Sequence, residues 1–191
     1  MKAQRKALVK LFTLQPRLED LVRKLERGDR TAQRKVYEML APKLLGVCRR
    51  YVKRLEEAEE VLSNTFVKIF TRIEDYNQSG PFEAWARKIA VNESLNFIRY
   101  QKNLFVEVDD EFRIEPSAKS VDTEHEVDAL MEMIDQLPLG YRTVFNLYAI
   151  EGYQHNEISD MLGITESTSR TQLRKARLYL QEQLESRNYL P

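Results

Sequence analysis

The sequence of 191 residues has little cysteine, glycine or proline, and it lacks a long hydrophobic run. Its single cysteine, Cys48, excludes a disulfide within one chain. Six glycines and six prolines are too few for a chain dominated by disorder, and 42% hydrophobic residues suffice for real cores. No apolar run approaches the roughly 20 residues that span a bilayer, and no segment resembles a secretory signal. We therefore expect a globular protein of the reducing cytoplasm, without membrane insertion.

Residues that hold metals or perform catalysis are equally scarce. The two histidines, His125 and His155, are far apart in the sequence and have no neighbouring ligand pattern. The acidic run EEAEE at 56–60 has no nucleophile, histidine or glycine-rich phosphate loop beside it. We therefore expect no metal, no cofactor and no catalytic residue, and an enzyme is the least favoured class of function.

Charge is balanced overall but unevenly distributed. Lysine and arginine together number 30, as do aspartate and glutamate, so the formal net charge is zero. The first quarter of the chain and its last helical stretch are basic, whereas segment 104–128 carries nine acids against two bases. A zero net charge thus conceals two basic bodies joined by an acidic segment, which we interpret as a flexible linker.

Apolar residues elsewhere recur at three- and four-residue steps, which is the stripe of an amphipathic helix. The N-terminal stripes comprise Val36, Met39, Leu40, Leu44, Val47, Cys48, Tyr51 and Val52; Val61, Leu62, Phe66, Ile69, Phe70 and Ile73; and Phe82, Trp85, Ala86, Ile89, Leu95 and Ile98. We expect Phe66, Phe82, Trp85 and Phe97 to belong to the core, and Cys48 to be buried and inert. The helical period returns from about residue 129, and the only strand-like pattern is a weak one at 105–108.

These patterns predict an all-α fold of two small helical domains joined by the acidic linker. The predicted bounds are 1–20 for a basic N-terminal extension, 21–103 for the first domain, 104–128 for the linker and 129–187 for the second domain. A membrane-surface role for the extension is less favoured than a solvated helix.

The stretch EISDMLGITESTSRTQLRKARLYL, at 157–180, predicts a helix-turn-helix. Gly163 suits the left-handed end of a short helix, and Thr165 is a candidate N-cap for the next one. One face of the second helix is apolar, with Leu173, Ala176, Leu180 and Leu184; the opposite face carries Ser167, Arg170, Thr171 and Arg174. Arginine can fork onto guanine edges, and hydroxyls suit phosphates. The pattern therefore favours DNA binding over a solvated surface helix.

Three stretches of sequence, one in the C-terminal block and two in the N-terminal block, resemble the extracytoplasmic-function (ECF) sigma factors, the small two-domain sigma subunits of bacterial RNA polymerase. LPLGYRTVFNLYAIEGYQHNEISDMLGITESTSRTQLRKAR resembles their C-terminal domain, which binds the upstream promoter element. EEAEEVLSNTFVKIF resembles the helix that docks on the clamp of the largest polymerase subunit, and GPFEAWARKIAVNESLNFIRYQK resembles the part that opens the AT-rich element. The resemblance covers about residues 21–184. It implies a sigma factor that binds core polymerase, recognises two promoter elements and helps to melt DNA.

The resemblance also implies roles for individual residues. The implied residues for docking on core polymerase are Glu57, Glu60, Ser63 and Asn64. The family usually has Gln and Glu in place of Ser63 and Asn64. Promoter melting and binding of a flipped-out base fall to Asn92, Asn96, Arg99 and Lys88. Upstream-element binding falls to Ser167, Arg170, Thr171, Gln172, Arg174 and Lys175, with Gln172 standing where many members carry Arg.

The implied partners are core RNA polymerase, promoter DNA, and an anti-sigma factor or another recruiting protein. We expect the acidic linker to thread a basic channel of the polymerase, its carboxylates standing in for RNA phosphates. The alternative is a stand-alone helix-turn-helix regulator whose N-terminal bundle senses a ligand or dimerises. A regulator of that kind binds a palindromic site tightly without polymerase, whereas a sigma factor binds its promoter specifically only in the holoenzyme.

Overall fold

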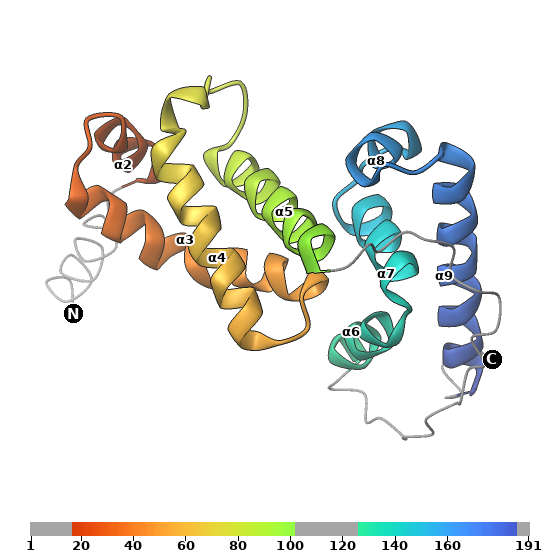
Figure 1. The fold of residues 1–191 in the computed structure, drawn as a ribbon. Coiled ribbons are helices and arrows are strands. Elements are labelled where there is room, and N and C mark those ends of the chain that lie inside the picture. The colour runs from red at the N-terminus through yellow and green to blue at the C-terminus, as the bar shows by residue number, and fades with distance from the viewer. Residues whose placement is uncertain (1–16, 102–125, 187–191) are drawn as a thin grey trace, which may run out of the picture. The chain divides into compact units, whose positions relative to one another are not determined.

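The structure is a computed structural model that describes residues 17–101 and 126–186, and every regular element in these two ranges is helical (Figure 1). The elements are α2 (Leu18–Leu25), α3 (Arg30–Tyr51), α4 (Leu55–Thr71), the short 3-10 helix η1 (Ile73–Asp75), α5 (Phe82–Gln101), α6 (Glu126–Gln136), α7 (Leu139–Phe145), the π-helical turn η3 (Asn146–Ile150), α8 (His155–Leu162) and α9 (Glu166–Ser186). The all-α prediction is confirmed. The N-terminal extension, most of the acidic linker and the weak strand pattern at 105–108 lie outside the described residues.

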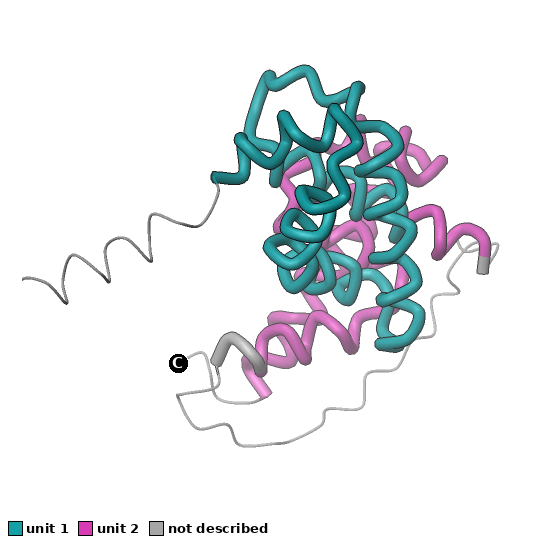
Figure 2. Tube along the Cα trace, turned by 90° about the vertical axis from the view of Figure 1, so that its left-hand side faces the viewer, with its two compact units in different colours: residues 1–94 teal, residues 95–191 magenta. Residues whose placement is uncertain are grey.

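The chain divides into two compact units, Met1–Ser94 and Leu95–Pro191, and the division falls inside α5 (Figure 2). The prediction of two small helical domains is confirmed as far as the number of compact units. The predicted bounds at 20, 103, 128 and 187 stay predictions.

In the first unit α3 packs against both α2 and α4. The side chain of Asp29 begins α3 by accepting backbone N–H groups of Thr31 at 2.8 Å and Ala32 at 3.1 Å. Such a cap satisfies donors that have no partner inside the helix. Most residues of the expected apolar stripes are buried, with Val36, Leu40, Leu44, Val61, Phe66, Ile69 and Phe82 in the core. The prediction is wrong for Met39, which is 42% exposed on α3.

Helix α5 is fixed to this unit by ion pairs at two points. Lys43 of α3 lies 2.9 Å from Glu83, and Lys68 of α4 lies 2.5 Å from Glu93. Trp85 packs on Phe82 with ring centroids 5.4 Å apart. Phe66 and Phe82 are buried, as predicted, while Trp85 and Phe97 are only half-buried.

Three small polar side chains meet in the middle of the first unit. Cys48 of α3, Thr65 of α4 and Ser94 of α5 are all fully buried. Burial raises the pKa of the Cys48 thiol to about 11, and hydrogen bonds with Ser94 and Thr65 offset part of that effect. The thiol therefore stays protonated and unreactive near neutral pH, which agrees with the expected buried cysteine.

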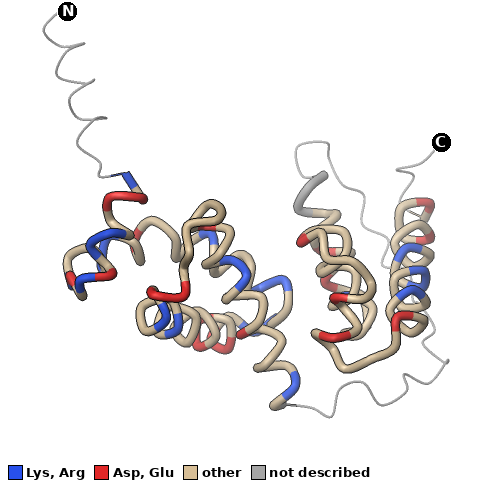
Figure 3. Tube along the Cα trace, turned by 90° about the horizontal axis from the view of Figure 1, so that it is seen from above, with Lys and Arg blue, Asp and Glu red and all other residues tan. Residues whose placement is uncertain are grey.

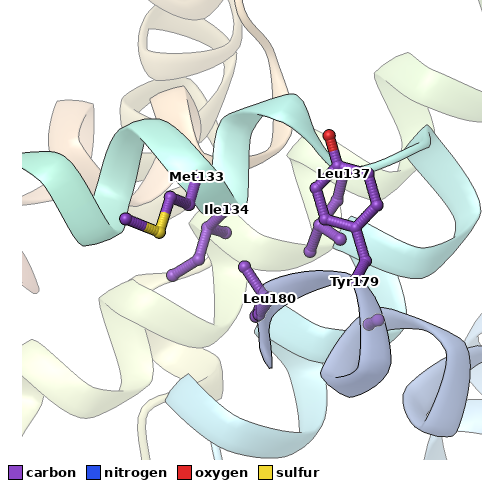
Figure 4. Packing of buried hydrophobic residues seen from close by; sticks show 6 residues of the cluster. Met133, Ile134, Leu137, Tyr179 and Leu180 are labelled. Carbon is purple, nitrogen blue, oxygen red and sulfur yellow. The ribbon is translucent and has the colours of Figure 1, made fainter. Parts of the chain in front are cut away.

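The core of the second unit joins α6 to the C-terminal half of α9. Met133, Ile134 and Leu137 of α6 point toward Tyr179 and Leu180 of α9 (Figure 4). This contact holds the far end of α9 and leaves its N-terminal half to pack on α7 and α8.

A buried arginine links α7 to α6. Arg142 is 4% exposed, and its Nη1 donates a hydrogen bond of 3.0 Å to the carbonyl of Asp135. Burial lowers the pKa of the guanidinium, and the nearby Asp135 carboxylate partly counters this. The cation caps the C-terminal end of α6, where carbonyl groups lack partners within the helix.

Candidate nucleic-acid interface

The turn between α8 and α9 has the predicted geometry. Gly163 ends α8 with a φ of 68°, in the left-handed region that favours glycine, and its N–H donates to the carbonyl of Ser159 at 2.9 Å. The hydroxyl of Thr165 accepts the backbone N–H of Thr168 at 3.0 Å. The expected roles of Gly163 and Thr165 are both confirmed.

Helix α9 has two chemically different faces. Leu173, Ala176 and Leu180 are buried, whereas the first three turns expose a row of polar side chains: Ser167, Arg170, Thr171 and Arg174. The cations lie in the middle of the helix, with acids toward both ends (Figure 3). The predicted separation of an apolar face from a polar face is confirmed. We call Ser167, Arg170, Thr171 and Arg174 the reading row.

Gln172 and Lys175 lie beside the reading row but are half-buried, because each contacts α7. The amide of Gln172 is so close to Gly140 that a Cβ there would come within 3.4 Å of it. Its Oε1 is buried, and the described residues offer it no hydrogen-bond partner. The Nζ of Lys175 lies 6.0 Å from the centre of the Tyr141 ring. Through these contacts both side chains pack between α9 and α7.

Arg170 is already engaged by an acid of its own helix. Its Nη2 lies 2.6 Å from Oε2 of Glu166, one turn earlier. Both side chains are largely exposed, so this pair is worth little in stability. It aligns the guanidinium along the helix, and an acceptor on another molecule must compete with Glu166 for it.

His155 forms a contact across the turn that the sequence did not indicate. Its Nδ1 lies 2.8 Å from Oγ of the buried Ser169, and its ring stacks on Tyr148 with centroids 4.7 Å apart. Burial, followed by the charge of Arg170 and then that of Arg177, lowers the pKa of His155, while Glu166 acts in the opposite direction. The ring is therefore neutral near pH 7.

Helix α5 also exposes a polar row. Lys88, Asn92 and Asn96 are exposed at steps of four residues, and Arg99 lies in the next turn. Nη1 of Arg99 donates a hydrogen bond of 3.3 Å to Oδ1 of Asn96. The structure thus brings the four predicted melting residues onto one side of one helix.

On α4 the predicted docking residues lie beside an exposed valine. Glu60, Ser63 and Asn64 are exposed, whereas Glu57 is half-buried and lies 3.6 Å from Arg54. Val67 is 60% exposed, three and four residues after Asn64 and Ser63, so it shares their face of the helix. Sequence reasoning missed Val67. The signal was present, because Val67 falls outside the apolar stripe that Phe66, Ile69 and Phe70 continue.

The part of the chain that the structure describes shows neither a metal site nor a membrane span. No group of three or more His, Cys, Asp or Glu side chains there could hold a metal ion. Among the described helices, none is long and apolar enough to cross a bilayer.

Comparison with known proteins finds two family models and several relatives. Sigma-70 region 2 matches residues 36–104, and Sigma-70, region 4 matches residues 128–180. The ECF RNA polymerase sigma-E factor of Haemophilus influenzae is 24% identical over 178 residues, which cover 86% of this chain and 94% of that protein. The RNA polymerase sigma factor SigV of Bacillus subtilis is 29% identical over 134 residues, covering 70% of this chain and 80% of SigV.

A solved structure shares the fold. It is the sigma factor RpoE in complex with the anti-sigma factor NepR from Bartonella quintana, with a TM-score of 0.50 and 18% identity, covering 80% of this chain and 96% of that chain. The two sigma-70 matches fall on the two helical blocks in the expected order, and together they cover more than half of the chain. The chain therefore belongs to the extracytoplasmic-function sigma factors, the RNA polymerase subunits that direct promoter-specific initiation of transcription.

Proposed function

We propose that the three exposed faces divide the work of initiation, with α9 reading the upstream promoter element, α5 opening the duplex and α4 docking on core polymerase. The observation that carries this proposal is the separation of faces on α9. Its cations and hydroxyls are exposed in one row, while Leu173, Ala176 and Leu180 are committed to the core. A recognition helix needs this division.

Arg170 and Arg174 are one turn apart in the reading row, with Thr171 between them. Each guanidinium can donate two parallel hydrogen bonds to a guanine edge, and the hydroxyls can bind phosphates. Arg170 must exchange Glu166 for its DNA acceptor, so Arg174 is the stronger candidate for base discrimination. Gln172 and Lys175 support α9 against α7 and make at most secondary contacts with DNA.

Asn92 is the residue of α5 that we assign to a flipped-out base. Removing a base from the stack costs a few kcal/mol, and hydrogen bonds to its exposed edge can recover part of that cost. An amide both donates and accepts, which matches a base edge. Lys88 and Arg99 supply positive charge at either side for the backbone of the opened strand, and Asn96 lies between Asn92 and Arg99.

The docking face of α4 comprises Glu57, Glu60, Ser63, Asn64 and Val67. Its carboxylates suit a basic partner surface, and Val67 adds apolar area that is left uncovered in the described residues. Since Ser63 and Asn64 cannot form the charged contact of a glutamate, we expect Val67 to carry more of the docking energy here.

The remaining assignments follow from family membership. We place the protein in the cytoplasm, where core polymerase works, and we assign it no catalytic activity of its own. The related RpoE was solved with an anti-sigma factor, and a protein of that kind is our candidate regulator for this chain. The domain bounds 1–20, 21–103, 104–128 and 129–187 are part of the same proposal.

Protection of promoter DNA against nuclease tests the proposal against the stand-alone regulator. Genomic fragments would be challenged with the chain alone, with core polymerase alone and with both together. We expect specific protection at two separated elements only when both are present. Tight protection of a palindrome by the chain alone would support the regulator instead.

A further inference from the structure

Four side chains of the C-terminal unit form a continuous series of contacts beneath the reading row. The guanidinium carbon of Arg177 lies 5.7 Å from the centre of the Tyr148 ring. The ring of His155 stacks on Tyr148 at 4.7 Å with an interplanar angle of 23°. Nδ1 of His155 then lies 2.8 Å from Oγ of Ser169, and the tautomer of the ring decides which atom donates. We call these four residues the stacked series.

The stacked series holds α9 at two points that lie on either side of the reading arginines. Ser169 precedes Arg170, and Arg177 follows Arg174 by three residues. Ser169 contacts His155, in the first turn of α8, and Arg177 contacts Tyr148, in η3. Both contacts therefore join α9 to elements that precede it in the chain. Two fixed points about two turns apart define both the direction of a helix and its rotation about its own axis.

Rotation of α9 matters because successive residues differ by about 100° around the axis. At a reach of roughly 6 Å from the axis, a rotation of 10° moves the end of a side chain by about 1 Å. A bidentate arginine contact has little tolerance for such a displacement, since both hydrogen bonds must be aligned at once. A phosphate contact made by a flexible side chain tolerates it better.

Apolar packing does not explain why residue 169 is a serine. Its side chain is fully buried on a helix face otherwise occupied by Leu173, Ala176 and Leu180. An apolar residue would fill such a position without the need for a partner, whereas a buried hydroxyl must be hydrogen-bonded. His155 supplies that partner from the other helix of the motif, fourteen residues earlier.

We propose that His155 and Ser169 are positioning residues for promoter discrimination, which set the rotation of α9 through their hydrogen bond and make no base contact themselves. This inference rests on the proposed reading role of α9. Loss of the hydrogen bond leaves α9 folded, because Leu173 and Leu180 still pack in the core. The helix can then rotate by a small angle about its own axis. Discrimination between promoters then falls more than the total capacity to initiate.

The test uses the full chain assembled with core polymerase. A promoter selected by the wild-type holoenzyme is compared with a copy altered only in its upstream element, and the ratio of run-off transcripts measures discrimination. Ser169→Ala and His155→Phe each remove the hydrogen bond, and the phenylalanine keeps a ring to stack on Tyr148. His155→Asn restores an amide near the position of Nδ1. Thermal unfolding of each variant measures the structural contribution separately.

We expect the ratio to fall by about three- to tenfold in Ser169→Ala and in His155→Phe, in line with the loss of one hydrogen bond. The double variant should fall no further than the worse single variant, and His155→Asn should keep most of the wild-type ratio. An unchanged ratio in the two single variants, with only a lower melting temperature, would overturn the inference. So would losses that multiply in the double variant. A wild-type holoenzyme that shows no promoter preference would instead refute the proposed function itself.

Discussion

Leu173 and Arg174 are adjacent in the chain but lie on different faces of α9, one buried and the other exposed. The side chain of Leu173 is 3% exposed and packs into the C-terminal unit, whereas that of Arg174 is exposed beside Thr171 and Arg170. A helix that turns about 100° per residue brings neighbours into different environments. Here the division separates a core residue from an exposed residue that we propose reads DNA.

Substitution of these two residues should have opposite consequences. We expect Arg174→Ala to lower initiation at cognate promoters by roughly ten- to a hundredfold, because a bidentate contact is worth about 1–3 kcal/mol of discrimination. Arg170→Ala should have a smaller effect. Leu173→Ala should instead lower the free energy of unfolding by about 2–5 kcal/mol. Run-off transcription and thermal melting of the same variants check both outcomes. If Arg174→Ala unfolds the unit while Leu173→Ala leaves it folded and removes promoter choice, the core face and the DNA-binding face of α9 are interchanged in our assignment.

Asn92 should matter for opening DNA rather than for folding, since its side chain is exposed. We expect Asn92→Ala to slow open-complex formation on a duplex promoter by about tenfold, the equivalent of roughly 1.4 kcal/mol for a lost base contact. A template that is already unpaired at the same element serves as the control, and the loss there should be much smaller. Equal loss on both templates would mean damage to binding or folding.

Val67 provides a direct test of the docking face. An acidic side chain in an apolar contact must be desolvated without a partner, so Val67→Asp should weaken assembly with core polymerase by at least about tenfold. Met39→Asp is the matched control, because Met39 is also an exposed apolar residue, at 42%, but lies on α3. Assembly can be measured by competition with a labelled wild-type chain. Similar losses in both variants would show that the face is not confined to α4.

The lowered pKa of His155 predicts a specific dependence of stability on pH. An unfolded histidine titrates with a pKa near 6.5, so below about pH 6.5 the unfolded state binds more protons than the folded state does. The free energy of unfolding of the C-terminal unit should therefore decrease as pH falls from 7 to 5.5. Arg170 and Arg177 oppose the protonated ring, and Glu166 favours it.

Chemical denaturation at several pH values tests this expectation, with His155→Asn as the control. The asparagine does not titrate and retains a group that can bond to Ser169, so its curve should be flatter than that of the wild type. Parallel curves for the two proteins would contradict the assigned environment of the ring. His125 is present in both proteins and cancels in the comparison.

Local features of the C-terminal motif were predictable from the sequence. The cap at Thr165, the left-handed Gly163 and the inward face of Leu173 depend on residues within one or two turns of each other. Periodicity and capping preferences encode such short-range relationships directly.

Contacts between helices were not predictable in the same way. The hydrogen bond from His155 to Ser169 joins residues fourteen positions apart and depends on the angle between α8 and α9. Gln172 contacts Gly140 of α7, although it directly follows Thr171 of the reading row. The burial of Arg142 depends on where α6 ends above it. None of these distances follows from periodicity alone.

Run-off transcription tests the central claim most directly. Purified core polymerase would be given linear genomic fragments with and without this chain, and the start sites of the transcripts would be mapped. We expect discrete transcripts that require the chain, and their loss at the same start sites with Arg174→Ala despite its normal melting temperature. Core polymerase that produces the same transcripts with and without the chain would contradict the account.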